Sequence, residues 1–245
     1  MADDAVAVER RRPLWLSILK WVGIALASIV VLLLAVVFGI NTDPGRRFVA
    51  DQLGGYSTAT GLNIKVGRID GSLYGKMTLS DVRVSDPKGV FLTSPRMAVD
   101  WRPFAFARNH IDVRSLDTEL VTLSRRPELI PVPVDPNAPI LPDLDIDVDR
   151  LRIARLVIAP LVTGQQHVLQ IDGTAHIADR RAQITADAVA LRAAGVAGGD
   201  RLRLKLDAVP DDDKLEVDLK LAAPVGGLVA TMGGLTKPLT ATVDG

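Results

Sequence analysis

Four aspartates at alternate positions form the densest set of potential metal ligands in this 245-residue chain. They are Asp143, Asp145, Asp147 and Asp149. A calcium-binding EF-hand loop needs glycine at its sixth position and glutamate at its twelfth. Counted from Asp145, these positions hold Arg150 and Leu156. Alternate spacing instead places the carboxylates on one face of a β-strand. We therefore expect a solvated strand face and predict no metal site.

The other residues that could do chemistry are few and scattered. The chain has no cysteine, which excludes disulfides, zinc–thiolate sites and thiol catalysis. His110, His167 and His176 have no partner at ligand spacing, so we expect single surface histidines, although a bend would bring His167 near His176. Ser72 follows Gly71 but lacks the second glycine of a nucleophile elbow. The three aspartates at 211–213 fit a turn. We predict no catalytic residue, no cofactor and no enzymatic activity.

Composition also bounds the partners. Lys plus Arg equals Asp plus Glu at 29 each, so no net field favours nucleic acid, and we predict no nucleic-acid partner. Hydrophobic residues make up 48% of the chain and aromatic residues only 4%. An apolar content this aliphatic suits repeated strands better than a compact enzyme core.

Residues 21–40 form a run of twenty without a charge. At ~1.5 Å per residue a helix of this length spans about 30 Å, the hydrocarbon thickness of a bilayer. Basic residues at 10–12 and 20 outnumber those that follow at 46 and 47, which favours a cytoplasmic N-terminus. A cleaved signal peptide has a shorter apolar region and a small-x-small site, which this run lacks. We expect an uncleaved anchor, with apolar positions that include Trp21, Ile24, Leu33, Phe38 and Ile40.

A period of two dominates after Gly61, following a short helix that Thr42-Asp43-Pro44 begins and Gly54-Gly55 ends. The phase slips once at Ser80-Asp81, as a β-bulge would cause. Six prolines then fall between 127 and 142, and proline cannot donate to a strand ladder. We expect an extended crossover there, between two β blocks.

The second block alternates most cleanly, with apolar residues on one face and charges on the other. Its apolar positions are the candidates for a functional surface: Leu169, Ile171, Ile177, Leu202, Leu204, Leu206, Leu215, Val217, Leu219 and Leu221. The last two strands form a hairpin around the turn at 210–213. Pairing residues whose numbers sum to 421 sets Lys205 opposite Glu216 and Arg203 opposite Asp218, so we predict that register.

No amphipathic helix after residue 61 is available to cover this apolar face. The sheet either folds over on itself as a sandwich or barrel with a closed core, or it folds partly and leaves an open trough of aliphatic side chains. Alternation alone does not decide between the two.

Several segments, in order along most of the chain, resemble the N-terminal region of the TamB family, the translocation and assembly module subunit related to AsmA-like proteins. They are NTDPGRR at 41–47, GSLYG at 71–75, TLSDVRVSD at 78–86, GVF at 89–91, VDWRP at 99–103, LVTLSRRP at 120–127, APVGGL at 223–228 and VDG at 243–245. The resemblance implies an inner-membrane anchor, a long periplasmic β-structure with a hydrophobic groove, and an outer-membrane barrel partner of the Omp85 class. It also implies phospholipid delivery and outer-membrane protein assembly.

Together these inferences predict a mainly β protein: a transmembrane helix, then an elongated antiparallel sheet curled into an open, β-taco-like groove. The expected parts are a cytoplasmic segment (1–20), the anchor (21–40), a short amphipathic helix (41–60), a first β block (61–126), the crossover (127–143) and a second β block (144–245). About ten strands at ~4.8 Å span only about 50 Å, whereas family members are much longer. We therefore expect an N-terminal fragment or a truncated member.

Three functions follow as hypotheses. The first is an inner-membrane-anchored conduit that carries phospholipid in a trough. The second is an assembly factor that offers a sheet edge to outer-membrane barrels. The third is a structural tether with a closed core.

Overall fold

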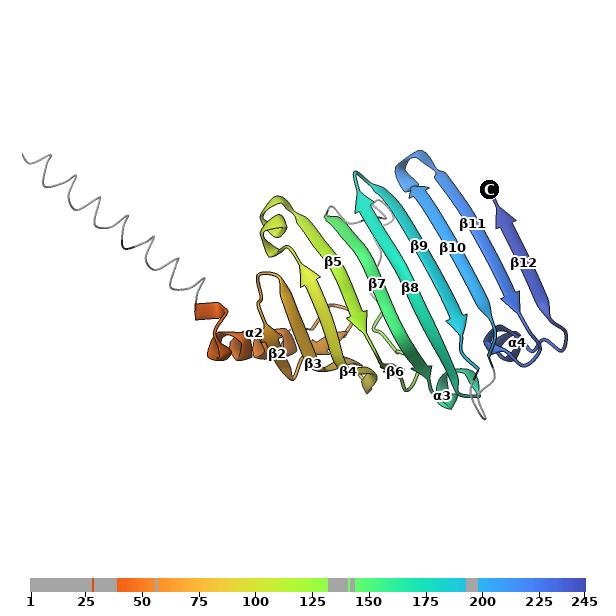
Figure 1. Ribbon diagram of the computed structural model, residues 1–245, viewed down its shortest axis with the longest axis horizontal. Coiled ribbons are helices and arrows are strands. Elements are labelled where there is room, and N and C mark those ends of the chain that lie inside the picture. Colours follow the sequence, from red (N-terminus) through yellow and green to blue (C-terminus); the bar gives the residue numbers. More distant parts are fainter. Residues whose placement is uncertain (1–27, 29–38, 56, 132–140, 142–143, 193–197) are drawn as a thin grey trace, which may run out of the picture.

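The computed structural model describes residues 28, 39–55, 57–131, 141, 144–192 and 198–245. Its centre is one twelve-stranded sheet, and Figure 1 shows the strands side by side from the N-terminal helix to β12. The strands are β1 (Asn63–Lys65), β2 (Arg68–Gly71), β3 (Lys76–Asp86), β4 (Gly89–Trp101), β5 (His110–Thr118), β6 (Val121–Leu123), β7 (Asp145–Ile158), β8 (His167–Ala178), β9 (Arg181–Ala190), β10 (Arg201–Val209), β11 (Lys214–Ala223) and β12 (Leu239–Asp244). The helical elements are α2 (Asp43–Gly55), η1 (Pro103–Arg108), α3 (Pro160–Thr163), η2 (Pro210–Asp212) and α4 (Leu228–Gly233). The protein is mainly β, as the period of two predicts.

The sheet is mixed rather than wholly antiparallel, which corrects the prediction. The main order is β1-β3-β4-β5-β7-β8-β9-β10-β11-β12, with β2 beside β3 and β6 beside β4 and β7. β7 runs parallel to both β5 and β6. The cause is the long proline-rich connection, because a hairpin reverses the chain whereas a long crossover can return it to the same end of the sheet. The two β blocks therefore join edge to edge in one sheet.

The β10–β11 hairpin has the predicted faces but a different register. Paired residues sum to 423, so Leu204 faces Leu219, and Lys205 faces Asp218. The turn decides this pairing. The N–H of Asp213 bonds the carbonyl of Pro210, and Asp213 closes the turn in the left-handed region with φ 52°. This four-residue loop sets Val209 opposite Lys214, and turn geometry outweighs weak cross-strand charge pairs.

The slip of phase in β3 lies at the predicted residue, but it is not a two-against-one bulge. Asp81 adopts a left-handed φ of 53°. The β3–β4 register is the same on both sides of it, because Ser80 faces Arg96 and Val82 faces Ser94. One residue in each strand, Asp81 and Pro95, drops out of the pairing. Leu79 and Val82 consequently reach the same apolar cluster although they are three residues apart.

Helix α2 covers the apolar face at the N-terminal end of the sheet. Ala50 is buried at 5% exposure and Val49 packs beside it. The buried side chains beneath it are Val66, Ile69, Leu73 and Val82. A second cluster, around Ile158, Leu169 and Ala190, lies beneath Val162 of α3 and Leu228 of α4. The described helices thus cover the two ends of the apolar face rather than its whole length.

A buried ion pair fastens the start of the crossover to the β3–β4 turn. Both carboxylate oxygens of Asp86 accept hydrogen bonds from Arg125, at 2.5 and 2.8 Å. The N–H groups of Lys88 and Glu128 donate to the same carboxylate, at 2.8 and 2.6 Å. These bonds, that of Arg125 foremost, hold the pKa of Asp86 well below its ordinary value against the opposing effect of burial.

The predicted anchor falls almost wholly outside the described residues, which include only 28, 39 and 40 of that segment. Within the described part of the chain, no helix combines the length and the apolar character needed to cross a bilayer.

We predict that Asp86→Asn lowers the midpoint of urea unfolding at pH 7, because the neutral amide loses a charge-assisted pair and leaves Arg125 without its counterion. The native carboxyl has a depressed pKa, so its stabilising effect is complete above about pH 5 and is lost as the pH falls through the native value. The difference between wild type and variant should therefore shrink in acid. Asp213→Asn, in an exposed turn, is the matched control and should change neither quantity. Equal stability of wild type and Asp86→Asn at pH 7 would contradict the role of this pair.

Candidate functional site

One face of the sheet is mainly apolar from strand to strand. The register aligns its side chains in rows that cross the sheet. One such row consists of Val113, Val148, Ala175, Ile184, Leu206 and Val217, on β5 and on β7 to β11. The next row consists of Leu116, Leu151, Gly173, Ala186, Leu204, Leu219 and Val243, and it extends to β12. All ten predicted surface positions lie on this face: four are members of these rows, and the other six lie two or four residues along their strand from a member.

Strand β9, which the sequence analysis did not identify, gives the middle of this face small side chains. It presents Ala182, Ala186, Ala188 and Ala190 between the branched residues of β8 and the leucines of β10. Its signal was alternation of alanine with arginine, glutamine, threonine and aspartate. Alanine is a weak strand former, which is why this signal is easily missed.

Exposure separates the covered part of the face from the rest. Leu169 lies under the α3–α4 end and is 8% exposed, whereas Leu215 at the β10–β11 turn is 61% exposed. The eight remaining predicted positions are half-buried: Ile171, Ile177, Leu202, Leu204, Leu206, Val217, Leu219 and Leu221. Leucines at the centre of a closed core are normally fully buried. These side chains keep contact with solvent in the described chain.

The opposite face carries the charges, and cross-strand ion pairs connect its strands. Arg181 of β9 donates to Asp207 of β10 at 2.7 Å, and Gln183 donates to the same carboxylate at 2.9 Å. These two bonds, that of Arg181 first, lower the pKa of Asp207 to about 2. Arg203 pairs in the same way with Asp187, at 2.8 Å.

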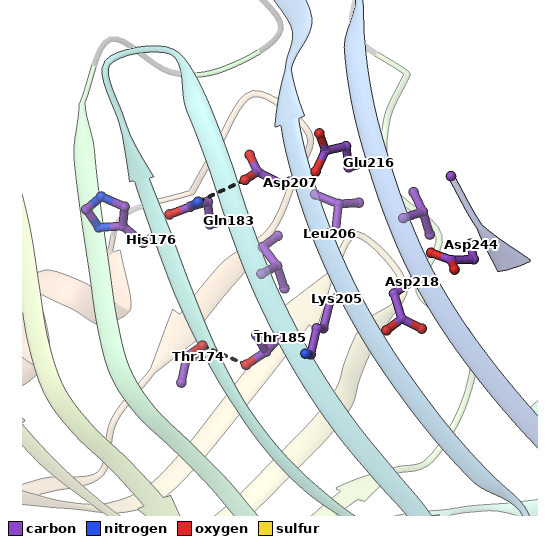
Figure 2. Close-up of a pocket in the computed structure, with 13 residues that line it drawn as sticks. Thr174, His176, Gln183, Thr185, Lys205, Leu206, Asp207, Glu216, Asp218 and Asp244 are labelled. Carbon is purple, nitrogen blue, oxygen red and sulfur yellow. Dashed lines mark hydrogen bonds between the residues drawn. The ribbon is translucent and has the colours of Figure 1, made fainter.

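A hollow of about 790 Å³ lies over this charged face rather than over the apolar one. Figure 2 shows its side chains rising from β8 to β12, with Thr174 and Thr185 bonded at 2.7 Å and Gln183 directed at Asp207. Lys205, Asp207 and Asp218 line it, and Leu206 and Val217 contribute from the strands between them. Its charged lining consists of one lysine and four carboxylates, namely Lys205, Asp207, Glu216, Asp218 and Asp244. The histidine in the lining, His176, bonds Asp147, which is not among the lining residues. Its chemistry is that of a solvated strand surface.

The histidines are not single surface residues, which corrects the prediction. Asp147 accepts a hydrogen bond from His110 at 2.7 Å through one carboxylate oxygen, and His176 bonds the other oxygen. The parallel β5–β7 pair and the antiparallel β7–β8 pair bring these residues together. Burial opposes ionisation of Asp147, but the bonds from His176 and His110 together outweigh it and lower the pKa of the carboxyl.

His167 differs from the prediction in another way. Register places it opposite Ile158 on the apolar face, where its side chain is fully buried. Neither ring nitrogen has a hydrogen-bond partner in the described part of the chain. Among the described residues, no group of three or more His, Cys, Asp or Glu side chains is arranged to hold a metal ion. Asp145, Asp147 and Asp149 follow the charged side of β7 and do not converge on one point.

Comparison with known proteins does not identify the chain, since no family model, no curated protein and no solved structure matches it.

Because Leu169 and Leu204 differ in exposure, we predict that replacing each by alanine lowers the free energy of unfolding by different amounts. Leu169→Ala should lower the free energy of unfolding by about 2–5 kcal/mol, as for a buried leucine that leaves a cavity. Leu204→Ala should cost only about 1 kcal/mol, because a half-exposed side chain loses less buried area and leaves no cavity. Equilibrium urea unfolding of the full chain measures both. Equal costs would show that Leu204 lies in a closed core.

Proposed function

We propose that this chain is the inner-membrane-anchored part of a TamB-like translocation and assembly module, and that its apolar sheet face carries phospholipid acyl chains through the periplasm toward the outer membrane. The observation that carries the proposal is the incompletely buried apolar face, on which eight of the ten predicted positions are partly exposed. A contiguous exposed apolar surface marks a binding surface for an apolar ligand or partner.

The mechanism is solvation. An acyl chain that moves from water onto leucine, valine and alanine side chains gains about 0.8 kcal/mol for each buried CH₂ group. The rows that cross from β7 to β11 offer successive contacts of nearly equal chemistry. A lipid can pass along a row from one strand to the next because no single contact holds it strongly. Its head group stays in water, so the site needs no catalytic residue and no cofactor.

The right-handed twist of a sheet of this size supplies the shape that such a path requires. Long sheets twist and coil rather than remain flat. In the proposed lipid-bound arrangement the apolar face curls inward around lipid to form an open groove, which differs from the structure, where the hollow lies over the charged face. The charged face with its Arg181–Asp207 and Arg203–Asp187 pairs faces the aqueous compartment. The apolar side chains then contact lipid, and the charged side chains contact water.

Residues 21–40 provide the anchor in this proposal, because they form an uncharged run of transmembrane length after a basic segment. The N-terminus is then cytoplasmic, the sheet is periplasmic, and the chain is a single-pass protein of the inner membrane. An outer-membrane barrel of the Omp85 class is the proposed receiving partner. The family resemblance supports this part, together with the mainly β architecture.

The test is photo-crosslinking in living cells. A photoreactive amino acid at Leu204 or Val217, on the apolar face, should capture phospholipid. The same amino acid at Lys205 or Glu216, one residue away on the charged face, should not. Mass spectrometry of the purified adducts measures capture. Absence of lipid at all four positions in a membrane-inserted, folded chain would contradict lipid transport and favour a structural tether.

A further inference from the structure

An aromatic cluster projects from the end of the sheet at which β5 begins. The short helix η1 carries Phe104, 70% exposed, and Phe106, 60% exposed. Phe104 is the most exposed of the large hydrophobic aromatic side chains in the described residues, and Phe106 equals Phe48 of α2, which is also 60% exposed. Phenylalanine at this exposure, twice in one turn, is unusual on a surface that faces only water. Arg108 follows in the same turn and is also exposed.

This cluster is held in place rather than loosely extended. The rings of Tyr74 and Phe104 stack with centroids 5.7 Å apart and an interplanar angle of 9°. Tyr74 belongs to the β2–β3 turn, where its N–H bonds the hydroxyl of Ser72 at 3.2 Å. The indole N–H of Trp101 donates to the carbonyl of Leu73 at 3.0 Å. The turn and η1 therefore form one unit, which we term the aromatic end (Tyr74, Phe104, Phe106 and Arg108).

The first residue after the uncharged segment is bonded to this same unit. The N–H of Leu73 donates to the side-chain oxygen of Asn41 at 3.0 Å, and the side-chain amide of Asn41 lies 3.4 Å from the hydroxyl of Ser72. Arg46 adds a bond to the carbonyl of Gly71 at 2.8 Å. A chain that leaves a bilayer at Ile40 consequently reaches the β2–β3 turn within one residue. The aromatic end cannot lie far from the membrane that holds residues 21–40.

We propose that the aromatic end rests in the polar–apolar interface of the inner membrane and fixes the orientation of the sheet relative to the bilayer. This inference rests on the proposed anchor. Aromatic rings and arginine are the residues suited to that zone, since rings partition to the level of the head groups and a cation attracts anionic lipid. We assign a lipid surface as the occupant because the bonds of Asn41 hold the β2–β3 turn close to the end of the proposed anchor, and hence close to the bilayer. Among the described residues, no comparable contact holds the aromatic end close to a second copy of the chain or to another protein.

The opposite end of the strands supplies an internal control. Since β5 and β7 are parallel, η1 before β5 and α3 after β7 lie at opposite ends of the sheet. Figure 1 shows α3 at the end where β7 finishes. Leu161 of α3 is 82% exposed, more than either phenylalanine. Exposure alone would favour Leu161 for membrane contact, whereas the proposed orientation keeps it in water.

Depth-dependent quenching tests the orientation. The chain has no native cysteine, so Phe104→Cys, Phe106→Cys and Leu161→Cys each place one environment-sensitive fluorophore. The full chain is reconstituted in vesicles of phosphatidylethanolamine and phosphatidylglycerol that carry spin-labelled lipid. Apolar side chains of interfacial segments enter roughly 5–10 Å, so labels at 104 and 106 should be quenched by head-group and shallow acyl spin labels. The label at 161 should not be quenched.

Flotation of the same vesicles separates the two proposals. Flotation of the chain with no more quenching at 104 and 106 than at 161 would overturn the docking while leaving the anchor intact. A blue-shifted label without lipid quenching would also overturn it, because the covering surface would then be protein. A chain that does not float removes the anchor and the docking together. Because Phe106 does not take part in the stack with Tyr74, its label remains informative if Phe104→Cys disturbs the turn.

Discussion

A sheet that is apolar on one whole face must cover that face with something, and in this protein the described helices are too small to do so. α2 has 13 residues, α4 has six and α3 has four. Each covers one end of a face that twelve strands form. Hydrogen bonds between the strands hold the backbone in place, but the leucines of β10 and β11 remain partly exposed to solvent. Exposed leucine carries a free-energy cost, and a bound acyl chain, a curled sheet or both would remove it. The proposed function is one way to meet this constraint.

The need to cover the apolar face extends along all the strands because the two β blocks form one continuous sheet. The parallel β5–β7 pair joins them, and it depends on a long crossover that returns to the correct end. Arg125 and Asp86 fix the beginning of that crossover through a buried two-bond pair. Across the junction itself, Asp147 binds His110 on one side and His176 on the other. The apolar rows therefore continue across the proline-rich connection, whose composition suggested a break.

Alternation of apolar and polar residues predicted which residues share a face of the sheet. The structure confirms these faces for β7, β8, β10 and β11. Alternation could not predict register, because a shift of two residues preserves both faces. The turn at Pro210–Asp213 decided the pairing, and it overrode a charge pattern worth only about 0.2–1 kcal/mol per pair. Alternation also failed at β9, where alanine gives little contrast with its polar neighbours. The Asp147 cluster could not be predicted because its members are 29 and 37 residues from Asp147 in sequence. Only the parallel junction makes them neighbours.

Helix α2 imposes a further condition on any path for lipid. It lies immediately after the uncharged segment, and Val49 and Ala50 pack on the part of the apolar face nearest to that segment. Partly exposed leucines in the apolar rows begin farther on, with Leu116 of β5 and Leu151 of β7, and continue through β10 and β11. A lipid leaving the inner membrane thus meets a covered surface before it meets an open one. Either α2 moves away from Ile69 and Leu79, or the lipid enters from the side of the sheet past the helix. The first route would expose a buried cluster with each transfer, whereas the second leaves the core intact. For the lipid transport proposed above, the lateral route is therefore the less costly one, because it leaves α2 packed on its cluster.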